Sequence, residues 1–171
     1  FACRPAGASI LGDCLYSSRP LGQPTTDNNA EGVHRARYHS RMHAIRLIET
    51  NQPLQWTELS DPSPGAGEIV VDVHRTGICH TDAHYRAGTG KTNLPVTLGH
   101  EIAGVVSAVG ADVTDVREGQ RVALHYLVSC GECPRCKRHG EQFCPTGQML
   151  GKERDGGYAQ YVRVPSRLLM P

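Results

Sequence analysis

The sequence predicts a mostly-β domain from the pattern of its strands and turns, and two further observations describe its core and a cysteine-rich segment. Short runs rich in Val, Ile and Thr alternate along residues 42–171 with clusters of Gly, Pro, Asp and Ser, which is typical of strands joined by turns. The 171 residues include only six Tyr, two Phe and one Trp, so the core must consist mainly of Val, Leu, Ile and Ala. One cysteine-rich stretch has almost no apolar residues. The length suits one domain of ordinary size.

The first half of this domain contains three predicted strands. We expect them at residues 43–48, 54–59 and 68–74, where β-forming residues are concentrated. The segment 61–67 reads Asp-Pro-Ser-Pro-Gly-Ala-Gly and is dense in turn formers, so it is predicted to be a loop.

The second half begins with a short predicted helix over residues 79–88. Asp82 would lie in its first turn and Gly88 suits its end. A strand is expected over 101–110, and Gly104 inside it indicates a bulge or a close approach of another backbone segment. Further strands are predicted at residues 121–124 and 158–164.

Residues 1–41 differ in composition from the rest of the chain. They contain three Pro and five Arg, and they show neither the apolar period of a strand nor that of a helix. They do not match the pattern of a secretory signal peptide. We interpret them as a disordered or spurious leader, with Met42 as the natural start; a mitochondrial-type leader is the weaker alternative. The predicted domain therefore covers residues 42–171.

The charge balance and hydropathy exclude two classes of partner. The chain has 18 basic and 17 acidic residues, a formal net charge of +1, which gives no cationic surface field for a nucleic acid. No stretch approaches the ~20 consecutive apolar residues of a membrane span. We therefore expect no nucleic acid and no membrane partner, and a cytoplasmic location.

Four cysteines define a predicted zinc lobe over residues 129–147. Their spacing is C-x2-C-x2-C-x7-C, formed by Cys130, Cys133, Cys136 and Cys144. Four thiolates complete a closed tetrahedral shell around Zn²⁺, which indicates a structural rather than a catalytic ion. Metal binding would also fold a segment that cannot fold by burial. An iron–sulfur cluster and disulfides remain the alternatives at this point.

A second group of metal-ligand residues lies in two separate segments. Cys79-His-Thr-Asp-Ala-His84 supplies a thiol, imidazoles, a hydroxyl and a carboxyl group, and Gly99-His-Glu101 supplies a further imidazole and carboxyl group. Catalytic zinc sites use three protein ligands and leave a position open for water or substrate. Each residue alone is a weak signal, but together they indicate such a site.

Residues 42–171 resemble the N-terminal, GroES-like catalytic domain of the zinc-dependent medium-chain alcohol dehydrogenases. The resemblance is carried by the zinc signature Gly99-His-Glu-x2-Gly104-x5-Gly110-x2-Val113, by the four-cysteine spacing, and by Gly156-Gly-Tyr-Ala-Gln-Tyr. It implies a mostly-β fold, a GroES-like partly open β-barrel with short helices and a structural-zinc lobe. It also implies the oxidation of small alcohols, or the reverse reduction of aldehydes and ketones, with NAD or NADP.

The resemblance implies a role for each residue of the second group. Cys79 and His100 would bind the catalytic zinc, and Glu101 would lie behind the metal and exchange as a ligand. Asp82 would accept the proton on the second nitrogen of His100 and so fix its tautomer.

The neighbouring side chains would serve the proton relay and the cofactor. Thr81 would take the alcohol proton, His84 would pass it to solvent, and His80 would lie against the cofactor pyrophosphate. A helix cap is the alternative role for Thr81, and an ordinary surface position is the alternative for His84. His125 and Tyr126 are expected to line a substrate pocket near the metal.

The family pattern extends beyond this sequence. Its third zinc ligand, typically Cys, and its Rossmann domain would follow Pro171. We therefore expect a fragment of a dehydrogenase that is an enzyme by family, has no turnover alone, and forms a homo-oligomer when complete. A self-standing zinc-binding module without hydride transfer is the alternative, as is a polyol-, formaldehyde- or cinnamyl-type dehydrogenase of the same family.

Overall fold

The computed structural model describes residues 41–170, so the predicted leader lies outside the described part except for Arg41, which begins the first strand. The mostly-β prediction is confirmed. In chain order the elements are β1 (Arg41–Leu47), β2 (Gln55–Ser60), β3 (Glu68–Thr76), α1 (His80–Arg86), β4 (Val96–Thr97), β5 (Ile102–Val109), β6 (Arg121–Leu124), β7 (Leu127–Val128), η1 (Cys136–Arg138), η2 (Glu141–Phe143), β8 (Gln148–Met149), β9 (Tyr161–Pro165), η3 (Ser166–Leu168) and β10 (Leu169–Met170).

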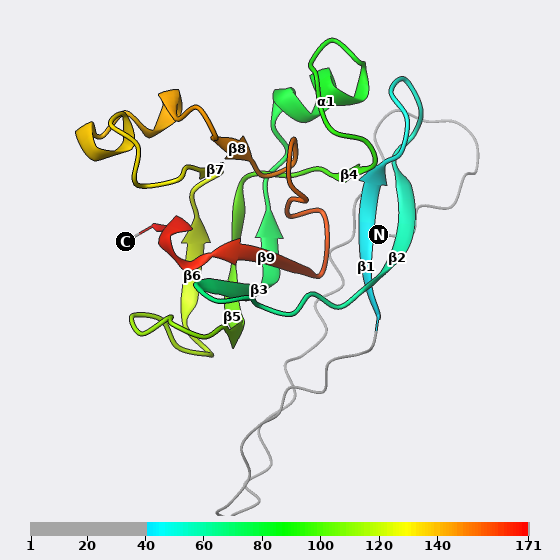
Figure 1. Ribbon diagram of the computed structural model, residues 1–171. Coiled ribbons are helices and arrows are strands. Elements are labelled where there is room, and N and C mark those ends of the chain that lie inside the picture. Colours follow the sequence, from blue (N-terminus) through cyan, green and yellow to red (C-terminus); the bar gives the residue numbers. More distant parts are fainter. Residues whose placement is uncertain (1–40, 171) are drawn as a thin grey trace, which may run out of the picture. The chain divides into compact units, whose positions relative to one another are not determined.

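Two antiparallel sheets form the body of the fold. The five-stranded sheet has the order β10-β6-β5-β3-β9, and the three-stranded sheet has the order β2-β1-β4. They are joined where Ala44 of β1 pairs with Ala159, just before β9. The larger sheet curls beside the β1–β2 hairpin, which gives the partly open barrel of the prediction (Figure 1).

The core consists of two clusters of buried side chains. The larger cluster contains only Val, Ile and Leu, as the scarcity of aromatic residues predicts. The smaller cluster packs beneath α1 and joins Leu47 of β1 to Tyr85, Val96 and Leu98. Because Val96 and Leu98 precede the segment that carries His100, this smaller cluster supports both halves of the second predicted metal site.

Gly104 marks the predicted close approach of two backbones. A Cβ atom at this position would lie 2.0 Å from the carbonyl oxygen of Asp72 on β3. The pairing of β3 with β5 is also irregular, with register shifts between Val70 and Val71 and between Val73 and Arg75. Glycine therefore allows β5 to lie directly against β3.

The helix α1 begins and ends as its sequence predicts. Cys79 is its N-cap, and the amide of Cys79 donates a hydrogen bond of 3.0 Å to the Asp82 carboxylate, which belongs to a capping box. Gly88, with φ of 71°, follows the helix and donates its N–H to the carbonyl of Tyr85. These contacts fix the orientation of the first helical turn.

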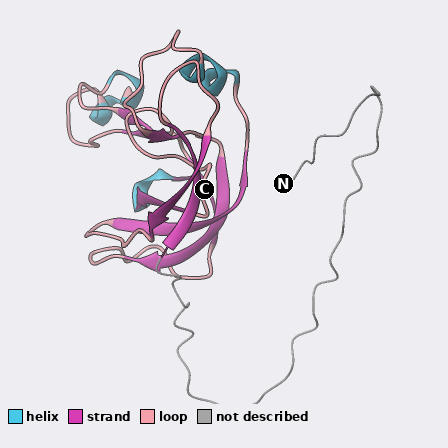
Figure 2. Cartoon of the chain, turned by 90° about the vertical axis from the view of Figure 1, so that its right-hand side faces the viewer, coloured by secondary structure: helices cyan, strands magenta, loops and turns pink. Residues whose placement is uncertain are grey.

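The cysteine-rich stretch forms a lobe between β7 and β8. These strands pair Leu127 with Met149 and Val128 with Gln148, so the two ends of the lobe lie side by side. The lobe contains only the short 3₁₀ turns η1 and η2. It lies at the same end of the strands as α1, as both views show (Figures 1 and 2).

The outer face of the β1–β2 hairpin is partly apolar. The side chain of Trp56 is 71% exposed, and its ring stacks on His43 with the ring centroids 5.0 Å apart. Among residues 41–170, no helix has the length and apolar character needed to cross a membrane.

Candidate functional site

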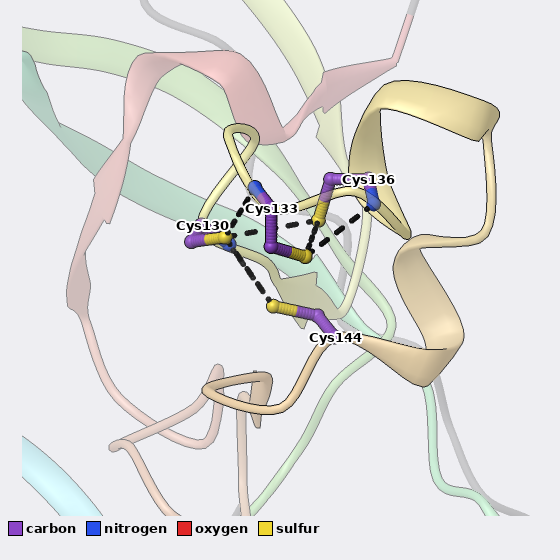
Figure 3. A group of neighbouring side chains, drawn as sticks. All are labelled: Cys130, Cys133, Cys136 and Cys144. Atoms are coloured by element: carbon purple, nitrogen blue, oxygen red, sulfur yellow. Dashed lines mark hydrogen bonds between the residues drawn. The ribbon is translucent and has the colours of Figure 1, made fainter.

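The four cysteines of the lobe converge on one point. The Sγ atoms of Cys133 and Cys136 are 3.5 Å apart, those of Cys130 and Cys144 are 3.6 Å apart, and those of Cys130 and Cys136 are 3.9 Å apart (Figure 3). Four sulfurs bound to Zn²⁺ at about 2.3 Å would be separated by about 3.8 Å in a regular tetrahedron. The sulfur positions therefore fit a single tetrahedral ion.

Backbone amides point at three of these sulfurs. The N–H groups of Cys133, Cys136 and Cys130 donate to the Sγ atoms of Cys130, Cys133 and Cys144 respectively, over 3.4 to 3.5 Å. Such donors offset the negative charge of a thiolate group. No cysteine in the described part of the chain forms a disulfide, including the four of this lobe.

The pKa values of the lobe thiols differ widely. The hydroxyl of Thr146 is the largest cause that lowers the pKa of Cys144 to about 6. Backbone N–H groups, first that of Cys133, lower the pKa of Cys130. Burial raises the pKa of Cys136 to about 11. At neutral pH the Cys136 thiol therefore keeps its proton unless a cation neutralises the thiolate.

The second predicted group also comes together in space. One ligand atom each of Cys79, His100 and Glu101 lies within 4.8 Å of the others. Cys79 is the N-cap of α1, and the other two lie in the segment between β4 and β5. A thiol, an imidazole and a carboxylate form the donor set of an open zinc site.

Asp82 lies close to His100, the neighbour that the family resemblance implies for it. It is 4% exposed, and its Oδ1 atom is 3.5 Å from Nδ1 of His100. Nδ1 is buried and makes no hydrogen bond within residues 41–170, so this contact is longer than a formed bond. Because Nδ1 faces Asp82, Nε2 is the nitrogen available to a metal ion.

The remaining candidate residues, His80, Thr81 and His84, all belong to α1, which follows Cys79. The Sγ atom of Cys79 is 3.4 Å from Oγ1 of Thr81, and Cys79 rather than Thr81 occupies the N-cap of α1. The exposed rings of His80 and His84 stack with their centroids 4.7 Å apart. Nδ1 of His84 also lies 3.1 Å from the hydroxyl of Thr89.

An open, mostly apolar pocket of about 450 Å³ adjoins this group. His125 and Tyr126 line it, as expected from their position before the lobe, together with Arg75, His100, Glu101, Ile102, Ala103, Leu124 and Met170. Hollows of about 550 and 560 Å³ lie elsewhere but contain neither group of metal ligands. Of these three hollows, the one beside Glu101 is lined by residues of a predicted metal site.

Two residues of the quoted motifs, Gly99 and Tyr158, contact Asp82, and the sequence did not predict these contacts. The hydroxyl of Tyr158 donates to Asp82 over 2.9 Å, and the amide of Gly99 donates to the same carboxylate over 3.2 Å. Tyr158 is separated from Asp82 by 76 positions, so no local spacing could have linked them.

Known proteins resemble this chain in sequence and in fold. Residues 65–171 match the family described as "Alcohol dehydrogenase GroES-like domain". An NAD-dependent alcohol dehydrogenase of Saccharolobus solfataricus is 38% identical over 133 residues, which are 72% of this chain and 38% of the relative. The NADP-dependent alcohol dehydrogenase C of Mycobacterium tuberculosis is 38% identical over 141 residues, 77% of this chain and 41% of the relative.

A solved structure gives the same result for the fold. The cobalt- and zinc-bound thermostable alcohol dehydrogenase of Pyrobaculum aerophilum superposes with a TM-score of 0.72 at 31% identity, over 76% of this chain and 41% of that protein. The chain thus spans about two-fifths of the length of the proteins it matches. It belongs to the alcohol dehydrogenase GroES-like domain family.

Proposed function

We propose that this chain forms the metal- and substrate-binding part of a zinc-dependent alcohol dehydrogenase that uses NAD or NADP. The observation that carries the proposal is the convergence of Cys79, His100 and Glu101 beside an open apolar pocket. Since the matched proteins are much longer, the activity belongs to a complete enzyme that also contains a nicotinamide-binding domain.

The four-cysteine lobe is proposed to hold a structural zinc ion. The separations between its sulfurs and the amides directed at them support this assignment. A single tetrahedral ion fits these positions without further ligands, whereas an iron–sulfur cluster would place inorganic sulfide and several irons among them.

Cys79, His100 and Glu101 are proposed to hold the catalytic zinc. Zinc held by these residues would supply a Lewis acid that lowers the pKa of an alcohol, in preparation for hydride transfer to a nicotinamide cofactor. The carboxylate of Asp82 would keep the proton of His100 on Nδ1, which leaves Nε2 for the metal. Glu101, whose side chain is exposed, would be the ligand free to exchange.

The proton relay is proposed to begin at Thr81. Its hydroxyl lies beside the Cys79 sulfur and would accept the alcohol proton there. His84 lies on the exposed side of α1 and would pass the proton to solvent. His80, stacked on His84, would contact the cofactor pyrophosphate.

The substrate class follows from the pocket. Apolar and aromatic walls beside a Lewis acid suit a small primary or secondary alcohol, or its aldehyde or ketone. We further propose a cytoplasmic enzyme that forms a homo-oligomer when complete.

Metal analysis of the purified chain tests the proposal. We expect two zinc ions per chain after dialysis, and one in each of the variants Cys79→Ser and Cys136→Ser, because each removes a ligand from one site. Cys14→Ser changes a cysteine outside both sequence motifs, is the matched control and should retain two. A Cys79→Ser chain that still holds two zinc ions would falsify the catalytic site.

A further inference from the structure

Asp82 is a buried carboxylate with almost all of its hydrogen-bonding capacity in use. Its Oδ2 atom accepts the amide of Cys79 over 3.0 Å and the hydroxyl of Tyr158 over 2.9 Å. Its Oδ1 atom accepts the amide of Gly99 over 3.2 Å and faces Nδ1 of His100 at 3.5 Å. A carboxylate offers about four acceptor positions, so the one that remains is directed at His100.

The N–H and the carbonyl group of Tyr158 both form backbone hydrogen bonds. Its N–H donates to the carbonyl of Leu98 over 2.9 Å, and its own carbonyl accepts the amide of Ile45 over 2.7 Å. Its ring lies against Gly99, where an added Cβ would come within 2.5 Å of the ring. The hydroxyl therefore reaches Asp82 from a fixed backbone and a fixed ring.

The Tyr158 hydroxyl also remains a donor over the working pH range. Burial first, and then the hydrogen bond to Asp82, raise the pKa of this phenol above its usual value of 10.0. The proton thus stays on Tyr158, and the Asp82 carboxylate remains the acceptor.

We propose that Tyr158 is a positioning residue for the metal-ligating imidazole: its hydroxyl fixes the rotation of the Asp82 carboxylate, so that Oδ1 holds the Nδ1 proton of His100 and Nε2 faces the metal. The inference rests on the proposed function of Cys79, His100 and Glu101 as zinc ligands. Without the hydroxyl, the carboxylate loses one of its three hydrogen bonds and keeps only the Cys79 amide on Oδ2 and the Gly99 amide on Oδ1, so its rotation toward His100 is less well fixed.

One substitution separates the hydrogen bond of the Tyr158 hydroxyl from the packing of its ring. Tyr158→Phe keeps the ring against Gly99 and both backbone hydrogen bonds, and it removes only the hydroxyl. Tyr161→Phe removes the same atom from a tyrosine in β9 that is outside the Cys79 group, and it serves as the matched control.

The experiment is a Co²⁺ titration of the full chain, which distinguishes the two sites by their visible spectra. We expect Tyr158→Phe to weaken binding of Co²⁺ at Cys79, His100 and Glu101 by about 10-fold and to change its ligand-field bands, in line with the effect of other groups that orient a ligand. Binding at the four-cysteine lobe should be unchanged, and Tyr161→Phe should match the unmodified chain.

A second measurement does not depend on metal affinity. In the metal-free chain, the ¹⁵N shifts of His100 should report a proton on Nδ1, and Tyr158→Phe should move them toward a mixture of tautomers. In an Asp82→Asn background, Tyr158→Phe should have no further effect on either readout, because the two residues act through one hydrogen bond. Circular dichroism verifies that each variant is folded.

The results distinguish a failure of the positioning role of Tyr158 from a failure of the proposed zinc site at Cys79, His100 and Glu101. If the unmodified chain binds cobalt only at the four-cysteine lobe, both are wrong. If it binds two ions and Tyr158→Phe changes neither the Co²⁺ bands nor the His100 shifts, the positioning role alone is wrong. An equal effect of Tyr158→Phe with and without Asp82→Asn would also contradict it.

Discussion

Thr146 donates the hydrogen bond that most lowers the pKa of a lobe thiol. Its hydroxyl lies 3.5 Å from the Cys144 sulfur and is the largest cause of the depressed pKa, about 6, of that thiol. The free cysteine pKa lies near 9.0, so the thiolate of the folded lobe persists as the pH falls from 9 toward 6 and is lost below about 6.

Thr146→Val should therefore raise the pH at which the lobe releases zinc. The valine has nearly the same shape but cannot donate, so protons compete for Cys144 at higher pH, and we expect the midpoint to rise by roughly half a unit. A chromogenic chelator followed during acidification measures the release. Thr57→Val, in strand β2 and outside both groups of metal ligands, is the control; an unchanged or lower midpoint for Thr146→Val would contradict a role of the Thr146 hydroxyl.

For individual residues, the sequence predicts those whose partners are close in the chain or whose spacing is specific to a metal site. The four cysteines of the lobe and the Cys79 and His100 segments were predicted, and the structure brings each group together. Tyr158 belongs to a quoted motif, but its bond to Asp82 could not be predicted in this way, because the bond depends on the closure of the barrel.

Among the elements, the lobe depends least on apolar burial. Between Cys130 and Gly147 the only buried residue is Cys136 itself. The lobe therefore has little to keep it folded other than its metal ion.

Removal of zinc should unfold the lobe and leave the strands intact. Trypsin sites at Arg135, Lys137 and Arg138 lie within it, and we expect cleavage there to accelerate by at least ~10-fold in excess EDTA, as the lobe samples open states more often. The β-sheet signal in circular dichroism should persist. Restored zinc should restore protection; cleavage that spreads at once through the strands would show that the lobe and barrel unfold together.

The longer elements were predictable and the shortest were not. The strands β1, β2, β3, β5, β6 and β9 and the helix α1 correspond to predicted segments. The strands β4, β7, β8 and β10 have two residues each, too few to show the alternation that identifies a strand. Pairing with distant partners defines them.

Across the whole molecule, the two core clusters have different consequences for the metal site. Leu47 and Ile69 are both fully buried, but Leu47 belongs to the small cluster beneath α1, and Ile69 to the large cluster within the barrel. Only the small cluster joins α1 to the segment before His100.

Leu47→Ala and Ile69→Ala should therefore differ in function although both lose stability. Each should lower the free energy of unfolding by about 2–5 kcal/mol, the usual cost of such a truncation. Only Leu47→Ala should also weaken metal binding at Cys79 and His100. Urea unfolding and Co²⁺ titration provide the two measurements, and equal loss of cobalt affinity in both variants would refute the distinction.

The order of strands in the sheets could not be predicted from periodicity. The β-rich runs indicate strands, but they do not specify that β3 lies between β5 and β9 or that β1 pairs with the segment before β9. The barrel was expected only through the family resemblance, and the superposition with solved dehydrogenases agrees with it.

The position of Trp56 determines what intrinsic fluorescence can report. It is the one tryptophan of the chain, and it lies on the exposed face of the β1–β2 hairpin against His43. Its emission therefore monitors that hairpin and is insensitive to the lobe and to the interior of the larger sheet. A denaturation curve recorded by fluorescence that precedes the curve recorded by circular dichroism would reveal that the hairpin detaches before the barrel opens.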